Sequence, residues 1–163
     1  LKDLVNLGYQ VILRPHPQMF ISKKKIIEKI EQEISELEFV SMDKSSSTED
    51  VMSAADILIS DLSGIIFDFY FVFEKPVIVI DGLISKSGQE AELVSKELWE
   101  IDNLKTIASV MPLEQINNIQ KHIEIAQEKT TKEKIVKFRE DSLFNYGIAG
   151  EVAANQILEK INQ

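Results

Sequence analysis

The sequence predicts an α/β fold in which a Rossmann-like parallel sheet is flanked by helices. Four short aliphatic runs, at 11–13, 38–40, 57–59 and 77–80, divide the first half of the chain. Three of them are almost continuously apolar, which is typical of strands buried on both faces of a parallel sheet. Segments with helical periodicity separate the runs. This alternation favours βαβ units with right-handed crossovers.

The first two strands are expected at Val11-Ile12-Leu13 and Glu38-Phe39-Val40. Between them four isoleucines recur at helical spacing, with lysines and glutamates around the outside, and this pattern predicts an amphipathic helix. The isoleucines are Ile26, Ile27, Ile30 and Ile34. After the second strand, the sequence 47–50 (Ser-Thr-Glu-Asp) is typical of a helix N-terminus, so a short helix is expected over 51–55.

The third strand is expected at 57–59, followed by a helix that Ser63 caps and that runs to about Val72. The fourth strand is expected at 77–80. Beyond it we expect only helices: a short one at 89–95, one at 103–110, one that begins at Pro112, one near 135–138 and a last one over 148–161.

The length of 163 residues and the composition, 44% hydrophobic and 28% charged, are those of one ordinary globular domain. We find no internal repeat, low-complexity tract or Pro/Gly linker. The sequence therefore predicts a single domain over residues 1–163. Because the sequence opens at Leu1 without an initiator Met, we expect it to be part of a longer protein.

The charge balance excludes some classes of partner. Eighteen basic and 27 acidic residues give a net charge of −9, which argues against a broad basic surface for nucleic acid or an anionic bilayer. The absence of cysteine excludes disulfides and thiolate chemistry and suits the cytoplasm. The most apolar stretch, 64–73, contains Asp68 and is shorter than the roughly 20 residues of a membrane-spanning helix.

The first candidate site is the sequence Arg14-Pro15-His16-Pro17, directly after the first strand. Ligands of open parallel sheets bind beyond the carboxyl ends of the strands. The two prolines stiffen this loop. Arg14 offers a planar set of donors to a phosphate, and His16 can donate a hydrogen bond or carry a proton. The alternative is that Arg14 pairs with a carboxylate or carbonyl cluster and that His16 is an ordinary loop residue.

The second candidate site is Ser60-Asp61-Leu62-Ser63-Gly64, directly after the third strand. A helix start there presents unpaired N–H groups and a partial positive charge to a phosphate, and Gly64 allows a ligand close to the backbone. The alternative is that Ser63 only caps its own helix. Neither GxGxxG nor GxxxxGK[ST] occurs, so the usual dinucleotide and P-loop motifs are absent.

Two further polar residues need an interpretation. Asp68 lies on an otherwise apolar helix, so we expect it to be paired, hydrogen-bonded or facing the cleft; the alternative is the solvent side of the helix. His122 follows Lys121 on a polar helix, and we expect it on the surface.

Three motifs in this order resemble one known family. They are Arg14-Pro15-His16-Pro17, the stretch 54–68 (Ala-Ala-Asp-Ile-Leu-Ile-Ser-Asp-Leu-Ser-Gly-Ile-Ile-Phe-Asp), and Lys75-Pro76-Val77-Ile78. Together they are similar to the C-terminal half of the CDP-glycerol:poly(glycerophosphate) glycerophosphotransferases, the teichoic-acid primases and polymerases. The closing segment 138–161 also resembles the last helix of that family. The family usually has Thr-Asp-Tyr-Ser-Ser where this chain has residues 60–64, which leaves the donor open.

The resemblance implies the donor-binding domain of a GT-B-type transferase that acts with an acceptor domain upstream of Leu1. It implies transfer of glycerol phosphate, or another polyol phosphate, from a CDP donor to a lipid-linked or polymeric acceptor, with neither a cofactor nor a metal. The carried-over roles are donor binding by Arg14, His16, Ser60, Asp61, Ser63 and Gly64, and catalysis by His16 and Asp68. Such enzymes work at the cytoplasmic face of the membrane, and this acidic chain has no anchor of its own.

Two alternatives stay open. The first is the nucleotide-binding half of another GT-B glycosyltransferase or of a sugar-nucleotide epimerase, which would share the phosphate site at the helix start. From a different class, a flavodoxin-like binding module without catalysis would share the same architecture. Receiver modules of that architecture carry acidic residues where the first strand ends, whereas this strand ends in Arg14 and His16.

Overall fold

The computed structural model describes residues 1–45, 47–82 and 99–162. The elements follow in the order α1 (Lys2–Asn6), β1 (Val11–Leu13), α2 (Met19–Ser22), α3 (Lys24–Ile34), β2 (Val40–Met42), α4 (Glu49–Ala54), β3 (Leu58–Ser60), α5 (Ile65–Phe71), β4 (Val77–Asp81), α6 (Trp99–Ile107), β5 (Ser109–Pro112), the 3₁₀-helix η2 (Leu113–Asn118), α7 (Ile119–Lys129), α8 (Lys132–Ser142) and α9 (Ala149–Ile161). The helix predicted over 89–95 lies outside the described residues.

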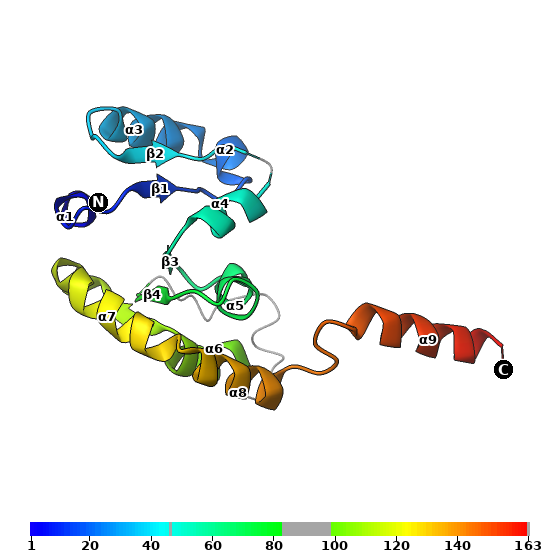
Figure 1. Cartoon of the computed structure of the whole chain (residues 1–163). Helices are drawn as coiled ribbons and strands as arrows, with labels where there is room; N and C mark the ends of the chain where they lie inside the picture. The colour runs from blue at the N-terminus through cyan, green and yellow to red at the C-terminus, as the bar shows by residue number, and fades with distance from the viewer. Residues whose placement is uncertain (46, 83–98, 163) are drawn as a thin grey trace.

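All described strand pairs are parallel, and helices flank them, so the predicted α/β, Rossmann-like class is confirmed. The strands form two sheets, β1–β2 and β3–β4–β5. In Figure 1, β1 and β2 lie with α2 and α3 in one layer, while β3, β4 and helices α5 to α8 lie in another; α4 lies between the two layers. Whether residues 1–163 form one domain stays a prediction.

Strand β4 is the central strand of the larger sheet and contributes to the hydrophobic core on both of its faces. Val77, Ile78 and Val79 are fully buried. Val77 and Val79 pack with α5, α6 and α8 in one hydrophobic cluster, whereas Ile78 packs with β5 and α7 in another. This alternation of faces follows from the two-residue period of a strand. Burial on both faces, which the sequence predicts for every strand, is therefore confirmed for β4.

The same prediction is wrong for β1. Ile12, at its centre, is 44% exposed, and its two neighbours are only half-buried. Helix α3 contacts β2 and places Ile27 and Ile34 in the interior. Within the described residues, the face of the β1–β2 sheet that carries Ile12 is therefore left partly uncovered.

Several predicted boundaries shift. The second strand begins at Val40 because Phe39 adopts φ 62°, a left-handed conformation that ends an extended strand. The predicted helix over 103–110 is instead α6 followed by the strand β5, which pairs with β4. Helix α5 begins at Ile65 with Gly64 as its N-cap residue and has no side-chain cap, so the predicted capping by Ser63 is wrong.

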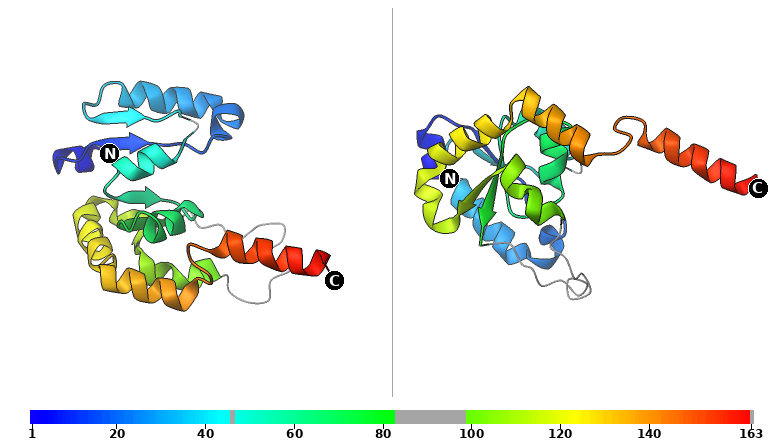
Figure 2. Two further views of the ribbon diagram at one scale, coloured as in Figure 1. Left: turned by 45° about the vertical axis from the view of Figure 1, so that its right-hand side comes forward. Right: turned by 90° about the horizontal axis from the view of Figure 1, so that it is seen from below.

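Helix α9 extends away from the rest of the chain in Figure 1 and in both views of Figure 2. None of its residues is buried. Among the described residues, no helix combines the length and the apolar character needed to cross a bilayer.

Candidate functional site

Arg14 follows β1 and is held by residues far along the chain. Its Nη1 donates to the carboxylate of Asp43, and its Nη2 donates to Thr48 Oγ1 at 3.0 Å. Ser45 accepts two further bonds from this guanidinium, through its hydroxyl at 3.2 Å and its carbonyl at 3.1 Å. The structure therefore has the pairing with a carboxylate that the sequence left as the alternative. Phosphate binding by Arg14 stays a prediction.

Asp43, directly after β2, organises this cluster from the acidic side. Its Oδ1 accepts the backbone N–H of Ser45 at 2.9 Å, and its Oδ2 accepts the Ser45 hydroxyl at 3.1 Å. The side chains of Arg14 and Asp43 are only 16% and 15% exposed. The sequence predicts Thr48 only as part of a helix N-terminus and does not indicate Asp43, because the bonds from Arg14 to Asp43 and Thr48 span 29 and 34 residues.

His16 is exposed at the tip of the proline-braced loop. Its Nδ1 accepts the backbone N–H of Gln18 at 3.2 Å, and its carbonyl accepts the N–H of Met19 at 2.8 Å. In the neutral ring this acceptor role at Nδ1 places the proton on Nε2. The loop therefore fixes one ring nitrogen internally and leaves Nε2 for a ligand.

The loop Ser60–Gly64 exposes its polar groups after β3. Ser60 is half-buried, while Asp61, Ser63 and Gly64 are exposed. The N–H groups of Ile66 and Phe67 donate to the carbonyls of Ser63 and Gly64, so part of the first turn is satisfied internally.

The remaining amides of this turn are open. Within the described ranges, the N–H groups of Ser63, Gly64 and Ile65 have no hydrogen-bond acceptor. A Cβ atom added at Gly64 would meet nothing within 4 Å. There is therefore space for a ligand against these amides, and such N–H groups attract anions.

Asp68 lies on α5 and is exposed, which agrees with the solvent-side alternative, and it also lines an open pocket of about 440 Å³. Thr48 and Glu49 at the start of α4, and Ile65 of α5, line the same pocket. Because Thr48 also accepts a bond from Arg14, the loop after β1 and the start of the helix after β3 lie at the same end of the molecule.

The structure does not join every predicted site residue. Within the described part of the chain, no hydrogen bond links His16 to the loop Ser60–Gly64. The one side-chain bond of that loop is internal, from Ser60 Oγ to Asp61 Oδ1 at 3.4 Å.

The N-terminal half of the chain, which carries both loops, matches the family model of CDP-glycerol:poly(glycerophosphate) glycerophosphotransferase over residues 1–82. The match covers just over half of the 163 residues. The chain belongs to this family. No curated protein and no solved structure matches this family member. The matched residues end before the closing segment 138–161, so its resemblance to the last helix of the glycerophosphotransferases stays a prediction.

His122 of this glycerophosphotransferase-family chain is buried at 5% exposure, so the predicted surface position is wrong. Its Nδ1 is 2.9 Å from Ser109 Oγ, and its Nε2 is 3.1 Å from Gln115 Oε1. Since the amide oxygen can only accept, Nε2 carries the proton and Nδ1 accepts from the serine hydroxyl. Burial, with a smaller contribution from Lys121, holds the pKa of His122 below its usual value. Ser109 is 2% exposed, which makes this pair part of the core.

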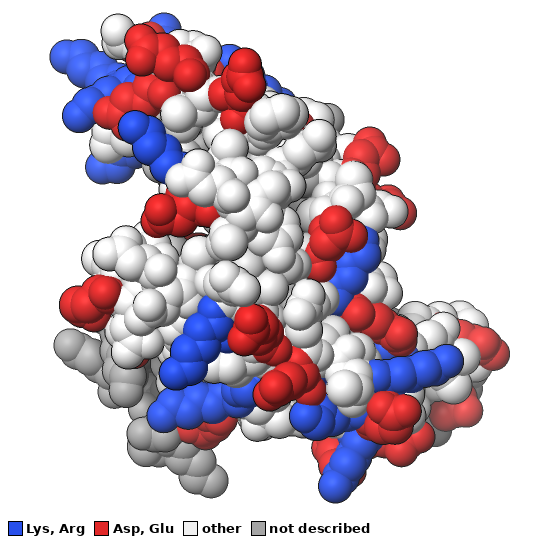
Figure 3. Space-filling model, turned by 60° about the vertical axis from the view of Figure 1, so that its left-hand side comes forward, with Lys and Arg blue, Asp and Glu red and all other residues white. Residues whose placement is uncertain are grey.

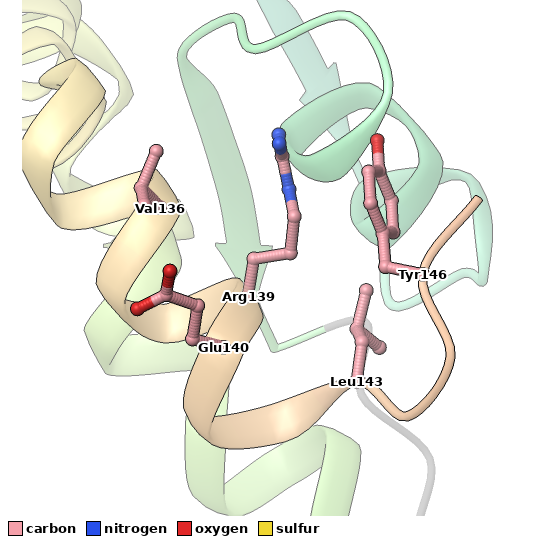
Figure 4. Close-up of a pocket in the computed structure, with 5 residues that line it drawn as sticks. All are labelled: Val136, Arg139, Glu140, Leu143 and Tyr146. Atoms are coloured by element: carbon pink, nitrogen blue, oxygen red, sulfur yellow. The ribbon is translucent and has the colours of Figure 1, made fainter. Parts of the chain in front are cut away.

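Arg139 and Tyr146 form a second cluster, at the wall of a pocket that also includes Val136, Glu140 and Leu143 (Figure 4). Arg139 Nη2 donates to the carbonyl of Phe71 at 2.7 Å and to Glu74 at 2.6 Å, and its guanidinium lies 4.5 Å from the centre of the Tyr146 ring. Tyr146 also donates to the carbonyl of Phe71 at 3.3 Å. These contacts fasten α8 and the segment after it to the end of α5 in the glycerophosphotransferase-family chain.

Charges of both signs are mixed on the face of the molecule shown in Figure 3. On α3, Lys24 and Lys29 each approach a glutamate one turn later, at 3.8 Å. Among the described residues, no group of three or more His, Asp or Glu side chains is placed to hold a metal ion.

Proposed function

We propose that this chain binds the donor of a transferase that moves glycerol phosphate, or another polyol phosphate, from a CDP-activated donor to an acceptor hydroxyl. The family match over residues 1–82 is the observation that carries the proposal, because it includes both candidate loops. The position of these loops at strand carboxyl ends, where ligands of parallel α/β sheets bind, supports it.

The donor's diphosphate would lie against the open amides of Ser63, Gly64 and Ile65, with Ser60 and Asp61 beside it. His16 and Arg14 would face the same phosphates from the loop after β1. The acceptor oxygen attacks the phosphorus that carries glycerol, the bond to the bridging oxygen breaks, and CMP leaves with the electron pair. His16 donates from Nε2 to a phosphate oxygen, and Asp68 takes the proton of the acceptor hydroxyl. Fixed dipoles and cations lower the energy of the charge that develops on the phosphates.

The proposal includes a second domain that binds the acceptor. An acceptor domain would complete a GT-B-type arrangement and present a lipid-linked or polymeric acceptor at the cytoplasmic face of the membrane, in the synthesis of teichoic acid or a related surface polymer. No cofactor or metal takes part in this proposal.

Calorimetric titration of the chain with CDP-glycerol, CDP-ribitol, CMP-sialic acid and a UDP-sugar tests the donor. A CDP-polyol should bind more tightly than the others. Preference for a UDP-sugar would indicate another GT-B glycosyltransferase or a sugar-nucleotide epimerase. Absence of binding to every nucleotide would favour a binding module without catalysis.

Substitution of the two loops tests the site in the full-length enzyme. His16→Ala and Ser63→Ala should each lower turnover on the order of 10²–10³-fold, as expected for groups that stabilise developing charge. Both side chains are exposed, so the thermal midpoint should change little. Lys25→Ala, at an exposed position of α3, is the matched control. Wild-type turnover in both variants would place the reaction elsewhere.

A further inference from the structure

The cluster around Arg14 and Asp43 connects three separate parts of the fold. Arg14 follows β1, Asp43 follows β2, and Thr48 precedes the first residue of α4. Four hydrogen bonds run from the two terminal nitrogens of Arg14 to Asp43, Ser45 and Thr48, and two of them end on Ser45. Asp43 lies within the family match over residues 1–82 but in none of the three motifs named above, and no role follows for it from the proposed function.

Asp43 is the acidic centre of the cluster. It accepts the guanidinium of Arg14 as well as the N–H and the hydroxyl of Ser45. Both members of the ion pair are mostly buried. Removing the carboxylate would leave the guanidinium without its counter-charge in a partly desolvated position, which is far less favourable than the intact pair.

The conformation of the loop that carries His16 depends on this anchor. Pro15 and Pro17 restrict the backbone on either side of His16. The ring is fixed through Nδ1 to the N–H of Gln18. Because Pro15 restricts the backbone between Arg14 and His16, a displacement of Arg14 should also displace His16.

We propose that Asp43 is a positioning residue for donor binding. Through Arg14 it fixes the loop after β1, and with it the imidazole of His16, relative to Thr48 and the pocket that Thr48 shares with Ile65 and Asp68. Asp43 does not contact the donor. The inference rests on the proposed function, because it concerns the phosphate-binding geometry of that same site.

The test compares Asp43→Asn and Asp43→Glu with the wild-type chain, with CDP-glycerol and cytidine as the two probes in calorimetry. Asp43→Asn should weaken CDP-glycerol roughly ten-fold or more, since small displacements of a binding group have effects of this size or larger. Cytidine, which has no phosphate, should bind as it does to the wild type. Asp43→Glu keeps the charge and should recover part of the affinity for CDP-glycerol.

Lys44→Ala is the matched control. Lys44 is the neighbour of Asp43 in the sequence, but its ammonium pairs with Glu31 of α3 and is largely exposed. This variant should bind both probes like the wild type. Thr48→Val provides a second route that keeps the ion pair intact: it removes one acceptor of Arg14 and should weaken CDP-glycerol less than Asp43→Asn does.

Three outcomes would overturn the inference. Equal loss of CDP-glycerol and cytidine in Asp43→Asn would mean a general structural role. Wild-type affinity of Asp43→Asn for CDP-glycerol would mean no role, while leaving the proposed function intact. Failure of the wild-type chain to bind either probe would contradict the proposed function itself. Amide chemical shifts of Gln18 and Met19 show directly whether the loop has moved. Where Asp43→Asn does not fold, the affinities of Asp43→Glu and Thr48→Val for CDP-glycerol and cytidine test the inference.

Discussion

His16 and His122 are the two histidines of the chain, and their surroundings are opposite. His16 is exposed and keeps Nε2 for a ligand, whereas His122 is enclosed and has both ring nitrogens engaged by Ser109 and Gln115. Burial disfavours the imidazolium form. Protonation of His122 should therefore favour the unfolded chain, in which the ring is exposed to water.

The sign of this effect follows from linkage. The pKa of His122 is lowered in the folded chain, so the unfolded chain binds more protons below its ordinary pKa of about 6.5. The free energy of unfolding should fall as the pH decreases from about 7.5 to about 5.5. Denaturant unfolding at several pH values measures this slope. His122→Gln should flatten it, and an unchanged slope in this variant would refute the assignment.

Gly64 allows structure and binding to be separated at one residue. Its φ of −56° is accessible to any residue, and an added methyl group meets nothing within 4 Å. Gly64→Ala should change the free energy of unfolding by less than about 1 kcal/mol, because the entropic gain of alanine and its weaker performance at a helix start oppose each other. It should nevertheless weaken CDP-glycerol in calorimetry if the donor approaches this backbone. Ser53→Ala, at an exposed position of α4, is the control.

At the residue scale the sequence predicts the types of group at the site better than their partners. It places Arg14, His16, Ser63 and Asp68 after the correct strands or on the correct helix. It cannot reveal that Arg14 bonds to Asp43, because that contact depends on the pairing of β1 with β2. For the same reason the surface prediction for His122 failed: Ser109, its partner, lies on β5, a strand that local periodicity had read as helix.

Among the elements, α4 and α5 are joined by Lys75, the lysine of the Lys75-Pro76 motif. Its ammonium donates to three carbonyls at the end of α4, those of Met52 at 3.3 Å, Ser53 at 2.6 Å and Ala55 at 2.7 Å. It also lies 5.9 Å and 6.0 Å from the ring centres of Phe69 and Phe73. A positive charge at a helix C-terminus satisfies its unpaired carbonyls and its dipole.

Lys75→Met should therefore lower the free energy of unfolding by about 1–3 kcal/mol, the usual cost of leaving polar groups without their charged partner. Urea unfolding followed by the fluorescence of Trp99 measures it. Lys29→Met, on the exposed side of α3, should have little effect. If Lys75→Met lowers the free energy of unfolding no more than Lys29→Met does, water would replace the ammonium at these carbonyls without loss of stability.

The strand pattern shows where periodicity succeeds and where it fails. The bounds predicted for β1 match the structure, and β4 is the strand for which the predicted burial on both faces is confirmed, because both of its faces are apolar. The sequence does not predict strand β5, since it contains Ser109 and Pro112 and is defined by its ladder with β4. Phe39 shortened the second strand through a left-handed φ angle that its residue type does not signal.

For the whole molecule, α9 contributes almost nothing to the core. It contains no buried residue, and Ile157, Leu158 and Ile161 are 58%, 56% and 73% exposed. A chain that ends at Ile148 should therefore have the same thermal midpoint as the full chain within a few degrees. A chain that ends at Leu143 should melt earlier, because it also loses Tyr146 and its contacts with Arg139 and Phe71. A large decrease for the first truncation would show that α9 packs on the rest.

The separation of the strands into two sheets has a consequence for local stability. In the layer of β1, α2, α3 and β2, Ile27 and Ile34 are the buried hydrophobic residues, whereas both hydrophobic clusters lie around β4. Regions with so little buried surface open at a lower free energy than the core. Backbone amides of this layer should consequently exchange with deuterium earlier than those of β4. If the proposed donor contacts both His16 and Ser63, its binding should slow amide exchange in this layer, because local opening would then also break contacts with the donor.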